Sequence, residues 1–206
     1  MESKRKPFLI KLAVAAVLTA MATVLMYYEV PLPLMPPFLK FDFSEIPVVI
    51  GSFAIGPVWG VVIELLKNLI HLPMTQTAGI GEMSNFITGS IFVVTAGLIY
   101  NKVHTKPGIL LSTAVATVVL ALAGIPLNAF VTLPLYANVL GFSTEAIVGM
   151  SRAVNPLITD KWSLIMWGFV PFNLFKGIIV TVLTFILSFP LTRPLRAIRR
   201  KAGLKT

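Results

Sequence analysis

The sequence predicts an all-α integral membrane protein, and three observations lead to that class. The 206 residues are 56% hydrophobic and only 12% charged, whereas a soluble domain carries roughly 25% charged residues. The mean hydropathy is +0.88. The apolar residues also form long continuous runs instead of alternating with polar ones. Because a backbone that crosses lipid must satisfy its own hydrogen bonds, runs of this kind favour helices over a closed barrel.

Basic residues account for the net charge of +9, and they gather at the two ends of the chain. Such clusters beside membrane spans mark the cytoplasmic side. They are not spread over one face, so the composition does not favour a nucleic-acid-binding protein. The sequence contains no cysteine, which excludes disulfides and thiolate metal sites. His71 and His104 have no ligand partner at a suitable spacing, so no metal site is predicted.

The number of spans depends on how residues 46–70 are interpreted. A bilayer core of about 30 Å requires roughly 20 helical residues, so this stretch is long enough to cross once as a single helix. Gly56 and Pro57 lie at its centre and break or kink helices. One helix gives five spans and places the basic ends on opposite sides of the membrane. Two short helices give six spans, with both termini in the cytoplasm.

We therefore predict six transmembrane helices in a single transmembrane domain over residues 1–206. The two short helices are expected to be tilted or to cross incompletely. The predicted spans cover about residues 8–28, 45–55, 57–71, 83–101, 108–131 and 162–190. Three longer connections then face outward, at residues 29–44, 71–84 and 131–163. The third is about thirty residues long, and its apolar patches predict an ordered segment, so we expect recognition on the outer side.

Two polar residues in the last apolar run are the strongest candidates for a binding site. Asn173 and Lys176 are three positions apart and therefore share a helix face. A lysine within a span is costly and indicates function, although a lysine that extends to the interface is the alternative. Asn128, near the outer end of the preceding span, offers donors and an acceptor to an amide edge. A bond between two helices would explain Asn128 equally well.

Other residues have both structural and functional interpretations. Ser44 is predicted to cap the second helix, with Asp42 or Glu45 at its positive end. Glu64 and Lys67 are predicted to form a structural pair. The stretch from Gly81 through Glu82 to Asn85 begins a helix and either meets a ligand or forms a turn. Ala16 and Ala20 are four apart on the first helix, a spacing that suits partner docking or internal packing.

No motif of a known enzyme class is present. The sequence lacks the nucleophile, zinc-protease and phosphate-loop patterns. If the protein supports active transport, ATP hydrolysis must therefore occur on another chain. A small intramembrane enzyme or a channel remains an alternative.

The order of motifs resembles one known family, the substrate-binding S components of energy-coupling factor (ECF) vitamin transporters. The similarity is strongest to the riboflavin-specific branch of that family. It is carried by the alanine-rich first helix and by four motifs spread over the chain. These are Leu39-Lys40-Phe41-Asp42-Phe43-Ser44-Glu45-Ile46-Pro47, Gly81-Glu82-Met83-Ser84-Asn85, Leu127-Asn128-Ala129-Phe130 and Pro171-Phe172-Asn173-Leu174-Phe175-Lys176.

The resemblance implies a prokaryotic plasma-membrane protein that binds riboflavin from outside as its transported ligand, without a cofactor. It implies docking on a transmembrane coupling subunit with two cytoplasmic ATPases, partly through the face of Ala16 and Ala20. It also implies toppling in the membrane to release the vitamin. The riboflavin-binding residues implied are Leu39, Lys40, Phe41, Gly81, Glu82, Asn85, Asn128, Asn173 and Lys176. We further expect Glu82 to pair with Lys176. An S component for thiamine or biotin is the nearest alternative.

Overall fold

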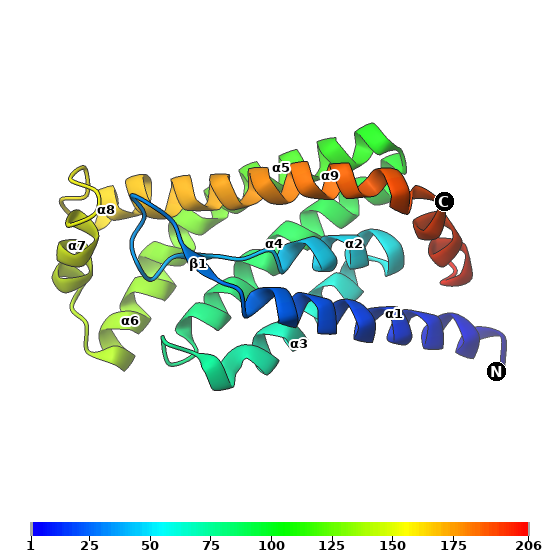
Figure 1. Ribbon diagram of the computed structural model, residues 1–206, viewed down its shortest axis with the longest axis horizontal. Helices are drawn as coiled ribbons and strands as arrows, with labels where there is room; N and C mark the ends of the chain where they lie inside the picture. Colours follow the sequence, from blue (N-terminus) through cyan, green and yellow to red (C-terminus); the bar gives the residue numbers. More distant parts are fainter. Residues whose placement is uncertain (1, 206) are drawn as a thin grey trace.

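The computed structural model describes residues 2–205 and consists mainly of helices that run along one long axis (Figure 1). The chain ends lie at the same end of the bundle. A short two-stranded ribbon and the small helices α6 to α8 lie toward the other end. In chain order the elements are α1 (Glu2–Met26), β1 (Val30–Pro31), β2 (Lys40–Phe41), α2 (Glu45–Ile55), α3 (Pro57–His71), η1 (Leu72–Met74), α4 (Ile80–Val103), α5 (Lys106–Leu127), η2 (Asn128–Thr132), α6 (Leu133–Leu140), α7 (Thr144–Arg152), α8 (Lys161–Leu164), η3 (Ile165–Phe169) and α9 (Val170–Lys201).

Four helical stretches of the described chain are long and apolar enough to cross a membrane, which agrees with the predicted class. They cover Arg5–Met26, Ile80–Val103, Lys106–Leu140 and Lys161–Lys201. The last two are longer than the predicted spans, because α5 continues through η2 into α6, and α8 continues through η3 into α9. Both η2 and η3 are single π-helical turns, a feature often found beside functional sites.

The helices α2 and α3 occupy the two short ranges on either side of Gly56. Gly56 has φ 100° and ψ 157°, a conformation that glycine adopts without the penalty of a side chain. Pro57 then starts α3, where its missing N–H costs nothing. The two helices run in opposite directions along the bundle (Figure 1). Their boundaries thus agree with the sequence analysis, whereas a full membrane crossing by each remains a prediction.

The centre of the bundle is α2, of which ten of the eleven residues are buried. It packs against α1, α3, α4 and α9, as expected for a helix that is apolar on all sides. Ser52 Oγ donates to the Val93 carbonyl of α4 at 2.8 Å. A methyl group at Gly97 would overlap with that hydroxyl, so the glycine permits close approach of the two helices.

The long third connection is ordered, as its apolar patches predicted. Its first ten residues continue the helix through η2 and α6, and α7 follows after Ser143. Leu133, Ile147 and Ile158 are buried in a second apolar cluster. The N–H groups of Ser163 and Trp162 donate to Asp160 at 2.9 and 2.7 Å, and these backbone bonds lower the pKa of Asp160.

A buried arginine fixes the C-terminal part of α9. This part contains Pro190 and Pro194 and turns toward α1 at the end where both termini lie (Figure 1). Arg199 is only 2% exposed. It donates to the Phe53 and Lys205 carbonyls, to Asn101 Oδ1 at 3.0 Å and to His104 Nε2 at 2.8 Å. Burial and the nearby Arg199 charge lower the pKa of His104. Because an arginine can only donate, His104 Nε2 is the acceptor in this bond.

Replacing Arg199 should therefore destabilise the bundle. Arg199→Met leaves buried acceptors without a donor, which costs about 2 kcal/mol of the free energy of unfolding. Arg196→Met, one turn earlier on an exposed position, should change it by less than about 0.5 kcal/mol. Thermal unfolding in detergent, followed by tryptophan fluorescence, measures both. Equal midpoints for the two variants would contradict the assigned role of Arg199.

Candidate functional site

A cavity of about 350 Å³ lies within the bundle, and residues from nearly every long element line it. Its wall is formed by the end of α1, the β1–β2 ribbon, the start of α2, the end of α3, and parts of α4, α5, η2, α6, η3 and α9. The volume falls within the range of about 300–1,000 Å³ that small-molecule sites occupy. Aromatic side chains and many polar or charged groups line it.

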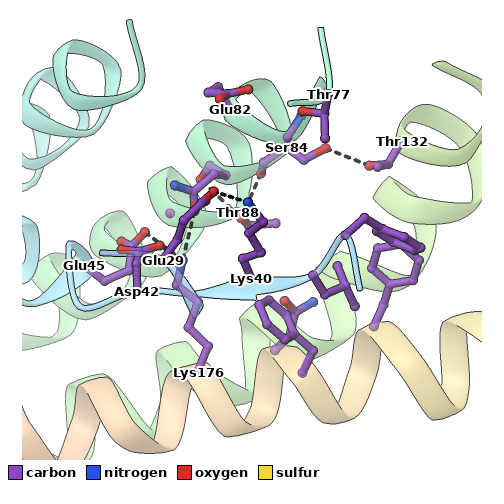
Figure 2. A pocket seen from close by; sticks show the side chains of 18 of the residues that line it. Glu29, Lys40, Asp42, Glu45, Thr77, Glu82, Ser84, Thr88, Thr132 and Lys176 are labelled. Carbon is purple, nitrogen blue, oxygen red and sulfur yellow. Dashed lines mark hydrogen bonds and ion pairs between the residues drawn. The ribbon is translucent and has the colours of Figure 1, made fainter. Parts of the chain in front are cut away.

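Lys176 provides a buried cationic group in the cavity wall. Its side chain rises from α9 toward the start of α2 (Figure 2). Nζ donates to Asn85 Oδ1 at 2.9 Å and lies 3.3 Å from Glu45 Oε1 and 3.9 Å from Asp42 Oδ2. Lys176 is 8% exposed. The lysine is therefore buried in the bundle, and carboxylates of the same cavity compensate its charge.

Two amides lie side by side near Lys176. Asn128 Nδ2 donates to the Gly124 carbonyl at 2.7 Å, which leaves Oδ1 directed elsewhere. A methyl group at Gly124 would overlap with Asn173 Nδ2, so the glycine makes the space that the Asn173 amide occupies. Both asparagines line the cavity. Together they present donors and acceptors to a ligand edge.

The opposite part of the cavity is aromatic and carries hydroxyl groups. The Phe38 ring lies 5.7 Å from the Tyr136 ring and 5.9 Å from the Phe169 ring, measured between centroids. Ser84 Oγ and Thr132 Oγ1 are 2.9 Å apart and join α4 to η2 (Figure 2). This region suits the flat face of a ring system and the hydroxyls of a polar chain.

Lys40 closes one side of the cavity. The β1–β2 pair brings Lys40 opposite Pro31, and its Nζ contacts the Glu29 carboxylate and donates to Gln76 Oε1 at 2.8 Å. Gln76 belongs to the connection between η1 and α4. Lys40 therefore joins the segment that follows α1 to the segment that precedes α4, beside the cavity.

The expected pairing of Glu82 with Lys176 is wrong. His71 Nδ1 lies 3.0 Å from Glu82 Oε1, and Thr75 Oγ1 donates to Glu82 Oε2 at 2.8 Å. The Tyr27 ring packs 5.3 Å from the His71 ring. Glu82 lies at the first turn of α4, away from Lys176 in Figure 2. Sequence spacing cannot place a carboxylate against a lysine on a distant helix, and Asp42 and Glu45 occupy that position instead.

Eight of the nine predicted ligand residues line the cavity, and the Phe41 ring does not. Phe41 is 4% exposed and packs edge-on against Phe43 and Phe175.

The predicted cap by Ser44 is also wrong, because Ser44 makes no side-chain cap bond and its Oγ accepts from Lys67. The Glu64–Lys67 pair is confirmed at 3.0 Å. Ala16 and Ala20 are exposed on α1, and their part in docking stays a prediction.

Several groups in the wall of the cavity were not predicted from the sequence. Asp42 and Glu45 were assigned to a helix terminus, although they belong to the same motif as Lys40. Tyr136 and Thr132 stand in the connection that was predicted to be ordered, and its apolar pattern gave no sign of a ligand contact. A polar residue at the end of an apolar run, such as Thr132, was the available signal.

These features define a class: a helical membrane protein with a buried polar and aromatic site for a small molecule. A family model described as "ECF transporter, substrate-specific component" matches residues 10–188. The chain therefore belongs to the family of substrate-specific components of ECF transporters.

The relatives of this chain extend over most of its length. It is 34% identical to a protein named riboflavin transporter RibU from Staphylococcus aureus (strain TCH60), over 86% of this chain and 87% of the relative. It is 30% identical to riboflavin transporter FmnP of Bacillus subtilis (strain 168), over 89% and 92%. A solved structure described as "Structure and mechanism of the S component of a bacterial ECF transporter" superposes with a TM-score of 0.71, at 30% identity, over 90% of this chain and 96% of that chain.

The contacts of Lys40 predict how mobile the two connections that it joins will be. Lys40→Met removes the bonds to Glu29 and Gln76, which are worth about 0.5–1 kcal/mol because they are partly exposed. Amide hydrogen exchange in residues 29–41 and 75–79 should then accelerate by about two- to fivefold. Lys102→Met, an exposed lysine at the other end of α4, is the control. Unchanged exchange in the Lys40 variant would show that other contacts close this side of the cavity.

Proposed function

We propose that this chain is the riboflavin-binding S component of an ATP-driven ECF importer. It captures the vitamin on the outer side of a prokaryotic plasma membrane and delivers it through a separate coupling module. The observation that carries the proposal is the convergence of Asn128, Asn173 and Lys176 in one aromatic-lined cavity. The names of the relatives, riboflavin transporter RibU and FmnP, support the same ligand.

The chemistry of riboflavin matches the cavity group by group. The vitamin has a flat ring system, a uracil-like edge of alternating donors and acceptors, and a polyol chain. The paired amides of Asn128 and Asn173 suit the uracil-like edge, and the Lys176 ammonium suits a ring carbonyl. The rings of Phe38, Tyr136 and Phe169 supply apolar walls, and nearby hydroxyls suit the polyol.

The charges of the cavity favour a neutral ligand over a cationic vitamin such as thiamine. Four carboxylates line the wall, which at first suggests a site for a cation. Each is already engaged: Glu29 with Lys40, Asp42 and Glu45 with Lys176, and Glu82 with His71. A cationic ligand would have to displace one of these partners, whereas riboflavin needs none displaced.

The orientation follows from the basic ends of the chain. We assign six spans in one transmembrane substrate-binding domain over residues 1–206, with α2 and α3 as the two short ones. Both termini then lie in the cytoplasm, because clusters of Lys and Arg flank the first and last spans. The termini share one end of the bundle (Figure 1). The ribbon and the connections beside the cavity then face outward.

Energy must come from partner chains. The sequence has no phosphate-binding loop, so we assign ATP hydrolysis to two cytoplasmic ATPases joined through a transmembrane coupling subunit. The exposed small side chains of Ala16 and Ala20 on α1 allow another helix to approach closely. That face supplies part of the docking surface. The chain itself is a binding subunit and performs no catalysis.

Titration with riboflavin tests the proposed ligand. Purified protein in detergent should quench flavin fluorescence in a saturable way. Lys176→Met should weaken binding by at least about tenfold, because a hydrogen bond to a charged group is worth roughly 1.5–3 kcal/mol. Lys102→Met, exposed and remote from the cavity, should bind like the parent protein.

Two results would count against this assignment. In the first, the parent protein does not quench flavin fluorescence, and thiamine or biotin stabilises it in a thermal shift assay. The ligand of the cavity would then be that other vitamin. Equal affinities of the Lys176 and Lys102 variants would leave riboflavin as the ligand but show that Lys176 does not contribute to its binding.

Docking requires a separate prediction. Ala16→Leu adds bulk to the exposed face of α1 and should abolish co-purification with the coupling subunit and the ATPases. Riboflavin binding should stay within about twofold, because Ala16 does not line the cavity. Val17→Leu, exposed on the next position of the same helix, is the control. Retained co-purification in the Ala16 variant would place the docking surface elsewhere.

A further inference from the structure

A second layer of charged side chains lies directly behind the cavity wall. Lys67 of α3 and its neighbour Glu64 are each fully buried, with 0% exposure, and neither lines the cavity. Lys67 Nζ donates to Ser44 Oγ and to Glu45 Oε1, both at 2.8 Å, and lies 3.0 Å from Glu64 Oε1. A charged group this deep in an apolar bundle is costly, so its presence requires an explanation.

Glu45 connects this layer to the cavity. The same Oε1 atom accepts from Lys67 Nζ at 2.8 Å and faces Lys176 Nζ at 3.3 Å. The carboxylate is therefore shared between one lysine that reaches the cavity and one that does not. Because the attraction of Glu45 is divided, Lys176 keeps its bond to Asn85 at 2.9 Å.

The contacts continue from Asn85 and close into a ring. Asn85 Nδ2 donates to Asn68 Oδ1 at 3.2 Å, and Asn68 Nδ2 donates to Glu64 Oε1 at 3.0 Å. Glu64 then returns to Lys67. Six side chains from α2, α3, α4 and α9 thus form a closed circuit in which three members line the cavity and three stand behind it. The members are Glu45, Lys176, Asn85, Asn68, Glu64 and Lys67.

We propose that Glu64, Lys67 and Asn68 are positioning residues that set the direction of the Lys176 ammonium and of the Asn85 amide. This inference rests on the proposed riboflavin site and names residues that act on the ligand without touching it. Lys67 shares the Glu45 carboxylate, so that Glu45 does not draw the Lys176 ammonium away from Asn85. Asn68 orients the Asn85 amide, so that its oxygen faces Lys176.

The space around the ring supports this role. A methyl group at Gly89 of α4 would overlap with the Glu64 carboxylate, so the glycine provides the room for a buried acid. Loss of any one member destabilises the ring, because its former partners stay buried without a hydrogen-bonding partner or water. Removing Lys67 leaves Asp42, Glu45 and Glu64 with the single cation Lys176.

A double-mutant cycle distinguishes positioning from general support of the fold. Lys67→Met should weaken riboflavin binding by about tenfold relative to the parent protein. In a Lys176→Met background the same change should alter affinity by less than about twofold, because its effect passes through Lys176. Arg199→Met is the matched control, since it also removes a buried cation but lies far from the cavity. It should lower the unfolding midpoint and leave affinity unchanged.

A milder variant keeps the test decisive if Lys67→Met fails to fold. Asn68→Ala removes the partner of the Asn85 amide and should weaken binding by about three- to tenfold. Losses that add fully to that of Lys176→Met, or parent-like affinity in both the Lys67 and Asn68 variants, would overturn the positioning role. A parent protein that does not bind riboflavin would instead refute the proposed function, so the two failures are distinguishable.

Discussion

The structure depends on one constraint: every charge buried in this apolar bundle must find a partner inside it. Glu45 shows the consequence, because its Oε1 atom serves two lysines from different helices. That single carboxylate ties the start of α2 to α3 and α9 at the depth of the cavity. The free-energy cost of leaving an ion unpaired at this depth is far larger than the entropic cost of ordering three side chains. The helices are therefore held in the register that the site requires.

A short buried helix makes this arrangement possible. The break at Gly56 ends α2 after eleven residues, so its first turn, with Glu45, lies inside the bundle beside the cavity. A continuous helix over residues 45–71 could not place Glu45 and Lys67 side by side, because about 22 residues of helix would separate them by roughly 33 Å. The reversal at Gly56 and Pro57 thus creates the contact between the two residues. The glycine that tolerates φ 100° is the local origin of a long-range ion pair.

Sequence reasoning was successful where local chemistry determines the result. The helix break at Gly56, the shared face of Asn173 and Lys176, and the order of the third connection all follow from periodicity and backbone preference. It failed where distant segments meet. Glu82 was expected to pair with Lys176, but its partner in the structure is His71. Ser44 was expected to cap a helix, but its Oγ accepts from Lys67. Lys176 and Asn85 are 91 positions apart, and no local pattern encodes such a contact. The ring of six side chains could therefore not be predicted, although its Glu64–Lys67 pair was predicted correctly.

The two ends of the bundle carry different structural features. The basic termini and the Arg199 network lie at one end, and the ribbon with α6 to α8 lies at the other (Figure 1). Arg199 reaches Phe53 of α2, and the first turn of the same helix carries Glu45 at the cavity. The helix α2 thus connects the Arg199 network to the cavity and is buried along almost its whole length. Closely packed interiors resist gradual deformation. A bundle whose central helix is held by Arg199 at one turn and by the charged groups of the cavity at another is therefore expected to resist deformation around the site.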